Sequence, residues 1–242
     1  KIIMNKIFIM GFPHSGTTVL RCVIGHIDEV EEIIDEADNI DIDDIKCDKK
    51  YILYKYAEPN PKFFEESYKN IIKIFIIRNP VYVFSSLNER YKNEIPPSNS
   101  LEIYNEIIKR FIYYENNKTD KNIYTIKYED LFNNNYEKIK NILDNIGIQY
   151  TNKIFNNTEY KNYSHTKLDQ IIDFYNKNLS ICPPEVHCEV NHKIKRNDQV
   201  NQPFVSNNNI NKINLTKPQK EYILNNKNIL YLYPDINDLL IN

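Results

Sequence analysis

The sequence lacks the features that mark membrane-spanning and nucleic-acid-binding proteins. Its 242 residues contain no apolar run near the roughly 18 residues that a membrane-spanning helix requires. The formal net charge is -2, which gives no overall attraction to nucleic acid or to an anionic membrane surface. We therefore expect neither a membrane span nor a nucleic acid partner, and any cations that bind an anion must be placed locally.

Cysteines are also few, and they do not form the paired CxxC pattern of a zinc site, so we expect no metal. Cys22 falls in a predicted helix, where a buried thiol is expected. Cys182 and Cys188 flank two prolines, and the sequence leaves open whether they form a disulfide. Low cysteine usage favours a reducing compartment, and residues 1–11 are too short and too soon interrupted for a secretory signal. We expect a cytoplasmic protein, with a removed signal or anchor left open.

Strand-like apolar runs alternate with segments of helical spacing, which predicts an α/β fold with a mostly parallel sheet flanked by helices. The run 71–77 has only Lys73 as a polar residue, as expected for a strand covered on both faces. Asn79 and Pro80 can then start a helix, and Gly147 can end one. The expected strands are 7–10, 51–56, 71–77 and 123–127, and the expected helices are 17–24, 80–91, 101–114, 136–146, 168–178 and 218–228.

The segment from Asp28 to Lys50 is rich in carboxylates and has little apolar periodicity. Runs of like charge are usually solvated. We expect a solvated loop or a lid here.

The most informative stretch runs from Lys6 to Ile24. It predicts a strand, a phosphate-binding loop and a helix, with glycines spaced as in the nucleotide-triphosphate loop GxxxxGK[ST]. Thr17, however, stands where that loop has its lysine, which meets the outer phosphates of Mg-bound nucleotides. The loop therefore keeps an anion cradle, while the kinase signature is incomplete.

Three motifs resemble those of sulfotransferases that use 3′-phosphoadenosine 5′-phosphosulfate (PAPS). Residues 11–20, GFPHSGTTVL, are similar to the family's 5′-phosphosulfate loop. Arg78-Asn79-Pro80 with Ser85-Ser86 resembles the 3′-phosphate motif RDPxxxxxS, and residues 128–131, YEDL, resemble a motif that follows a later strand. The motifs occur in the family's order within about residues 6–147, while the C-terminal third matches loosely. The resemblance is greatest to the carbohydrate and tyrosyl-protein branch.

The resemblance implies a P-loop-type three-layer fold, a single domain over 1–242, and PAPS as co-substrate. The cofactor-binding core would span about 6–147, and the acceptor and clamp region about 150–242. Arg78 and Ser86 would bind the 3′-phosphate, and the basic residues Lys195 and Arg196 would clamp it, unless their segment is only a solvated loop. Glu129 and Asp130 are expected to hold a helix start. The loop residues implied in cofactor binding are Pro13, His14, Ser15, Gly16, Thr17 and Thr18.

His14 departs from the family pattern, because members usually carry lysine or arginine at this position. A protonated imidazole with a pKa near neutrality could stabilise charge on the bridging oxygen and make the rate pH-dependent. Alternatively, His14 only caps the loop. Lys55, at a position resembling the lysine of a KxP motif in some members, could supply the cation or could be an exposed strand-end lysine.

The general base is the remaining catalytic group. In the tyrosyl-protein branch an acidic residue in the loop after the first helix takes the acceptor's proton, and Glu36 lies near that place. His26 is the second candidate, although it is also suited to close the first helix.

These features predict metal-independent, in-line transfer of the sulfuryl group of PAPS to a hydroxyl of a glycan, a tyrosyl peptide or a small alcohol. One alternative is a degenerate P-loop kinase that uses Mg-ATP. Another is a non-catalytic descendant that only binds PAPS or another nucleotide. The acceptor and the oligomeric state are not readable from the sequence.

Overall fold

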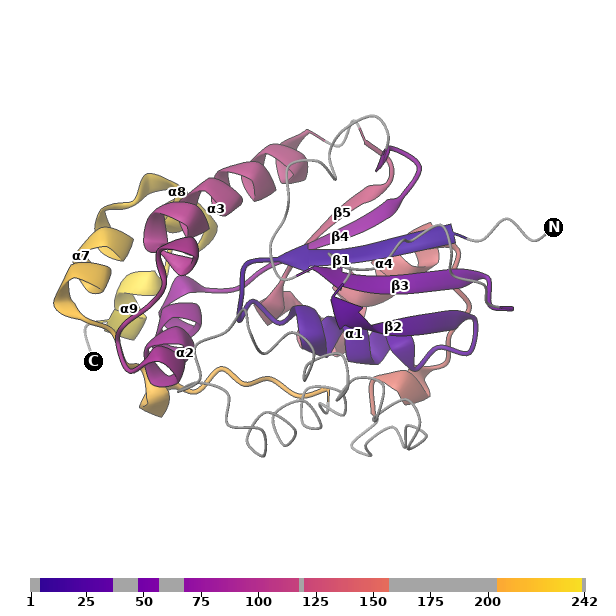
Figure 1. Ribbon diagram of the computed structural model, residues 1–242, viewed down its shortest axis with the longest axis horizontal. Helices are drawn as coiled ribbons and strands as arrows, with labels where there is room; N and C mark the ends of the chain where they lie inside the picture. Colours follow the sequence, from indigo (N-terminus) through magenta and orange to yellow (C-terminus); the bar gives the residue numbers. More distant parts are fainter. Residues whose placement is uncertain (1–4, 37–47, 57–67, 118–119, 157–203, 241–242) are drawn as a thin grey trace, which may run out of the picture.

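A computed structural model describes residues 5–36, 48–56, 68–117, 120–156 and 204–240. Its centre is a 5-stranded sheet in the order β2-β3-β1-β4-β5, in which each neighbouring pair is parallel (Figure 1). The strands are β1 (Asn5–Gly11), β2 (Val30–Glu36), β3 (Tyr51–Tyr56), β4 (Ile72–Ile77) and β5 (Ile123–Lys127). The predicted α/β fold with a parallel sheet is confirmed.

Helices cover both faces of the sheet. They are α1 (Thr17–Gly25), α2 (Pro80–Tyr91), α3 (Leu101–Asn116), α4 (Glu137–Ile146), α7 (Lys217–Asn225), α8 (Lys227–Leu232) and α9 (Ile236–Leu240). Successive residues of a strand point to opposite faces. Phe8 of β1 belongs to the apolar cluster that includes residues of α2, α3 and α7–α9, while Ile9 belongs to the cluster that includes residues of α1 and α4. Figure 1 shows α7, α8 and α9 beside α2 and α3. No described helix combines the length and apolar character needed to cross a membrane.

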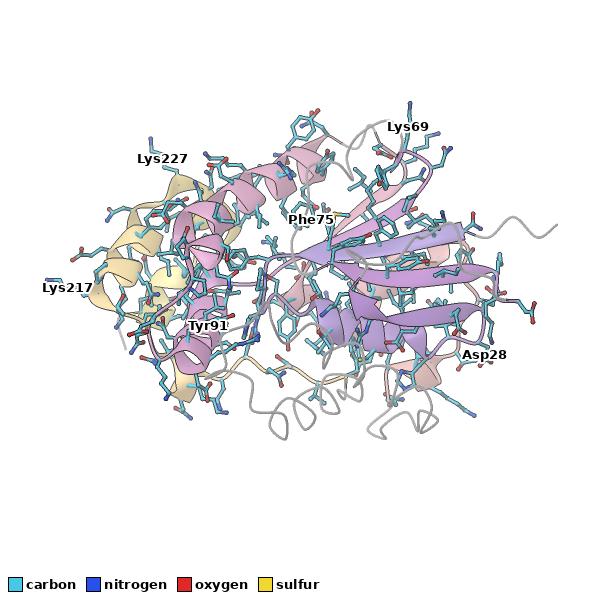
Figure 2. All side chains as sticks on the ribbon, in the orientation of Figure 1. Asp28, Lys69, Phe75, Tyr91, Lys217 and Lys227 are labelled. Atoms are coloured by element: carbon cyan, nitrogen blue, oxygen red, sulfur yellow. The ribbon has the colours of Figure 1, made fainter. Side chains whose placement is uncertain are left out.

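Aromatic pairs join the sheet to the helices on the first of these faces. Phe75 of β4 lies between the sheet and α3 (Figure 2), where its ring centre is 5.6 Å from that of Phe111. At the end of β1, Phe12 makes an edge contact with Tyr104, also of α3, at 5.1 Å. These contacts fix the position of the segment that follows β1.

The acidic segment 28–50 is not wholly a loop, as its residues 30–36 form the edge strand β2. The side chain of Glu32 is buried there and forms an ion pair of 2.8 Å with Arg21 of α1. Because a buried cation neutralises this carboxylate, an acidic segment can enter the sheet. The expectation of a loop is thus wrong for these residues, and residues 37–47 lie outside the described chain.

Helix boundaries largely follow the predicted caps. The side chain of Asn79 accepts the N–H of Val81 at 2.9 Å, and Gly147 closes α4 with a φ of 81°. The helix predicted near 218–228 is two helices, since the side chain of Asn226 caps a new helix, α8. Cys22 is a buried free thiol, as expected. The predicted helix 168–178 and the other cysteines, Cys47, Cys182 and Cys188, lie outside the described residues.

Candidate active site

The candidate site lies at the carboxyl ends of the central strands β1 and β4. Gly11 and Ile76 are register partners, so the loop after β1 and Arg78 after β4 leave the sheet at the same edge. The helix after β1 packs on one face and the helices after β4 on the other. Such a switch point is where open α/β sheets bind ligands.

The loop after β1 is a tight turn leading into α1. The N–H of Ser15 donates to the carbonyl of Phe12 at 3.0 Å, and both His14 and Gly16 have left-handed φ angles, 66° and 92°. Gly16 is the N-cap residue of α1, and no side chain accepts a hydrogen bond from the first N–H groups of the helix at this position. The first N–H groups of a helix have no intrahelical acceptor, and the helix dipole places positive charge there. The loop can therefore cradle an anion.

Two close approaches explain the glycines of this loop. A Cβ on Gly16 would lie 2.3 Å from Cδ2 of Tyr128, and a Cβ on Gly11 would lie 2.3 Å from the carbonyl oxygen of Ile76. Any side chain at either position would push the loop away from its neighbours. The Tyr128 ring thus forms a wall of the loop.

Arg78 links the loop to the rest of the site. It is 8% exposed, and its Nη1 donates to the carbonyl of His14 at 3.1 Å. Its Nε donates to Oδ1 of Asn208 at 2.9 Å, and its guanidinium carbon lies 4.4 Å from the ring centre of Tyr128. Burial lowers the pKa of Arg78, yet arginine stays charged in proteins. A fixed positive charge therefore lies beside the anion cradle.

Tyr128 and Glu129 attach a C-terminal segment to the site. The hydroxyl of Tyr128 accepts the N–H of Asn207 at 2.8 Å, while Oε1 of Glu129 accepts from Nδ2 of Asn208 at 3.3 Å. The same carboxylate oxygen accepts the N–H of Asn79 at 3.0 Å, so Glu129 holds the start of α2. Burial raises its pKa. The contribution of Asn207 and Asn208 was not predicted, because no local pattern marks them.

His14 is enclosed by cations and by α2. Its Nδ1 shares a hydrogen bond of 2.6 Å with the hydroxyl of Ser86. Burial, followed by the charges of Arg90, Arg78 and Lys55, lowers the pKa of His14 from 6.5 to about 4. The imidazole is therefore neutral at pH 7, which differs from the near-neutral pKa expected from the sequence.

The structure also places Lys55 beside the loop. The side chain is 5% exposed, and its Nζ lies 3.5 Å from the hydroxyl of Thr18, so it is not an exposed strand-end lysine. The backbone of Glu36 pairs with that of Lys55, which puts residue 36 at the carboxyl edge of the sheet. His26 caps α1, with Nδ1 bonded to the carbonyl of Cys22, and thus closes the helix.

The two predicted clamp residues, Lys195 and Arg196, lie outside the described residues. Arg90 was not predicted, although its charge acts on His14 more strongly than those of Arg78 and Lys55. The spacing of four residues between Ser86 and Arg90 on a predicted helix was the available signal.

A family model described as "Sulfotransferase domain" matches residues 4–200. The chain belongs to the sulfotransferase family. No curated protein matches this chain.

Solved structures similar to this chain include a mouse sulfotransferase, SULT7A1, complexed with PAP. The identity is 21% and the TM-score 0.47, over 62% of this chain and 60% of that one. A retinol dehydratase in complex with androsterone and inactive cofactor PAP has 12% identity and a TM-score of 0.39, over 63% of each chain. A sulfotransferase domain from the curacin biosynthetic pathway has 13% identity and a TM-score of 0.42, over 64% of this chain and 78% of that one. The matched region is thus under two thirds of the first two proteins.

Proposed function

We propose that this chain transfers the sulfuryl group of PAPS to a hydroxyl acceptor. One observation carries the proposal, namely that Arg78 donates to the carbonyl of His14. This bond brings a guanidinium suited to a phosphate next to a loop suited to a second anionic group. A nucleotide with anionic groups at both its 3′ and 5′ positions matches that pair.

The residues of the site fit such a nucleotide. Glycines at positions 11 and 16 keep the loop free of side chains that would collide with Ile76 and Tyr128. Arg78 and Lys55 contribute positive charge, which acts on His14. Thr17, in place of the lysine of nucleotide-triphosphate loops, removes the group that serves the outer phosphates of ATP or GTP.

We assign the 5′ end to the loop and the 3′-phosphate to α2 and β4. Gly16, Thr17 and Thr18 would donate N–H or hydroxyl groups to the 5′-phosphosulfate, with Pro13 and Ser15 shaping the turn. Arg78 would make the paired contact that guanidinium groups make with phosphate, and Ser86 would add a hydroxyl. Lys195 and Arg196 are proposed to clamp the same phosphate.

When bound, PAPS supplies an activated sulfuryl group, and its loss to the acceptor oxygen leaves adenosine 3′,5′-bisphosphate (PAP). Glu36 would take the proton of the acceptor hydroxyl as the new sulfur–oxygen bond forms and the bond to the 5′-phosphate oxygen breaks. Lys55 would offset negative charge at the 5′ end, and His14 would position Ser86 through their hydrogen bond. We propose that this in-line displacement needs no metal and that the acceptor is a glycan, a tyrosyl peptide or a small alcohol.

Calorimetric titration with PAP, and separately with ADP and Mg²⁺, tests the proposal. We expect PAP to bind with and without EDTA, and Arg78→Ala to weaken PAP binding at least about tenfold because a charge-assisted contact is lost. The matched control is Arg110→Ala, because Arg110 lies beside Tyr114, a residue of α3 outside the site. This variant should bind PAP normally.

The other outcomes separate the alternatives. Preference for Mg-ADP would favour a kinase. PAP binding without sulfuryl transfer to any member of a panel of glycans, tyrosyl peptides and alcohols would favour a non-catalytic descendant. Absence of PAP binding would overturn the proposed function.

A further inference from the structure

The side chain of Arg78 is held by Asn208, a half-buried residue 130 positions later in the chain, in the segment 204–216 that precedes α7. Oδ1 of Asn208 accepts the Nε–H of Arg78 at 2.9 Å, and its Nδ2 donates to Oε1 of Glu129 at 3.3 Å. The same oxygen of Glu129 accepts the N–H of Asn79 at 3.0 Å. Because Asn79 follows Arg78 directly, these bonds close a ring that joins the guanidinium to the backbone after β4.

The two ends of the Asn208 amide face partners of opposite kind. Its oxygen faces the Nε–H of Arg78, and an arginine side chain has only donors. Its Nδ2 faces a carboxylate oxygen of Glu129, which accepts. The amide therefore has one orientation that suits both partners, and this orientation fixes the direction of the Nε–H bond.

The remaining contacts of Arg78 hold its guanidinium plane and leave donors for a ligand. The guanidinium carbon lies 4.4 Å from the ring centre of Tyr128 and 5.8 Å from that of Tyr82. Nη1 donates to the carbonyl of His14 at 3.1 Å. Among the described residues, the hydrogen bonds to Asn208 and His14 therefore use two of the five N–H donors of the guanidinium. The other three, including both on Nη2, are available to a phosphate.

An amide can hold a guanidinium without cancelling its charge. Arg21 shows the other case, because its partner Glu32 is a carboxylate and the pair is buried. Asn208 instead connects Arg78 to Glu129 and adds no charge of its own. We propose that Asn208 is a positioning residue, which orients the guanidinium of Arg78 toward the 3′-phosphate and leaves its charge for that phosphate. This inference rests on the proposed function and names a residue that acts through Arg78.

Two nucleotides that differ only in the 3′-phosphate test this role. We would titrate the protein with PAP and with adenosine 5′-monophosphate, which lacks the 3′-phosphate. Asn208→Ala is expected to weaken PAP about tenfold and to leave the 5′-monophosphate within about twofold of the wild type. The matched control is Asn211→Ala, in the same segment, because Asn211 is exposed and its described contact uses the backbone N–H. This control should bind both nucleotides normally.

A double-mutant cycle separates positioning from a general structural effect. In the Arg78→Ala background, Asn208→Ala should change PAP affinity by less than about twofold, because the side chain that it positions is absent. Asn208→Asp keeps an acceptor for the Nε–H but adds a negative charge beside the guanidinium, so it should weaken PAP more than Asn208→Ala does. This variant is nearly isosteric, and it tests the inference even if the alanine variant does not fold.

The outcomes are distinct from those of the proposed function. If Arg78→Ala weakens PAP but Asn208→Ala binds it as tightly as the wild type, the inference is overturned and the proposed function stands. Equal losses for the two nucleotides, or a full loss that persists in the Arg78→Ala background, would also overturn it. PAP affinity of Asn208→Asp equal to that of the wild type would contradict the need for a neutral partner. A wild type that does not bind PAP would overturn both the inference and the proposed function.

Discussion

The guanidinium carbon of Arg78 lies 4.4 Å from the centre of the Tyr128 ring, and the same ring packs against the backbone of Gly16. One aromatic side chain thus holds both parts of the candidate site, namely the loop after β1 and the cation after β4. Its hydroxyl has a separate task, because it accepts the N–H of Asn207 from the C-terminal segment.

Replacing Tyr128 should separate these two tasks. Tyr128→Phe keeps the ring and should cost about 1 kcal/mol of unfolding free energy, with PAP affinity within about twofold of the wild type. Tyr128→Leu removes the ring beside Arg78 and Gly16 and should cost about 3 kcal/mol, with PAP affinity reduced about tenfold. Urea unfolding and calorimetry would measure the two effects. Equal losses of affinity in both variants would contradict the assigned role of the ring.

Gly16 and Gly147 form a natural pair for a second prediction. Both have a left-handed φ, but a Cβ on Gly147 would meet only the hydroxyl of Tyr51, at 3.9 Å. Gly147→Ala should cost about 1 kcal/mol through the φ angle alone and should not change PAP affinity. Gly16→Ala also collides with Tyr128 and should cost about 3 kcal/mol and weaken PAP strongly. If urea unfolding and PAP titration gave the same results for both variants, the loop contact would have no special role.

Replacing one partner of the buried ion pair between Arg21 and Glu32 should destabilise the protein more than replacing both partners. Both side chains are at most 3% exposed, so Arg21→Met removes the cation beside a buried carboxylate and should lower the free energy of unfolding by about 3 kcal/mol or more. The double variant Arg21→Met with Glu32→Met should recover most of this loss. Urea unfolding of the single and double variants at pH 7 provides the measurement, and a double variant no better than Arg21→Met would argue against the pairing.

His14 should make the protein less stable in acid. Burial, Arg90, Arg78 and Lys55 lower its pKa to about 4, whereas the unfolded chain titrates near 6.5. Between these values the unfolded state binds more protons, so stability is full above pH 6.5 and falls as the pH drops toward 4. The loss of unfolding free energy is at most about 3 kcal/mol, because partial exposure of the His14 side chain to solvent weakens the effect.

The control for this pH effect is His14→Gln, which removes the titrating group and keeps a polar side chain. Its free energy of unfolding, measured in urea from pH 7 to pH 4, should fall less steeply than that of the wild type. Parallel pH profiles for the two proteins would show that His14 titrates normally.

The parts of the fold that could be predicted from the sequence depend on neighbours in the chain. The run around β4, the Asn79 cap and the stop at Gly147 are such cases, since a few adjacent residues determine each one. Strand β2 could not be predicted in this way. Its carboxylates resemble a solvated surface until Arg21, on a different element, neutralises Glu32.

The residues of the candidate site likewise divide into those that local motifs identify and those that only the folded chain brings together. The loop and Arg78 were identified through their motifs, and the structure brings them within hydrogen-bonding distance. Asn208 follows Arg78 by 130 residues, and only the folded chain brings the two together. Arg90 is intermediate, because helical spacing from Ser86 suggests a shared face, whereas its effect on His14 requires the tertiary structure.

The attachment of the C-terminal segment to α2 has a consequence for the time at which the site forms during synthesis. Asn208 meets Arg78, the N–H of Asn214 donates to Ser85, and the Gln219 side chain pairs with that of Asn88. All five strands leave the ribosome before any of these partners is translated. A nascent chain can therefore assemble its sheet early, while its nucleotide site matures only after residues 208–219 have been translated.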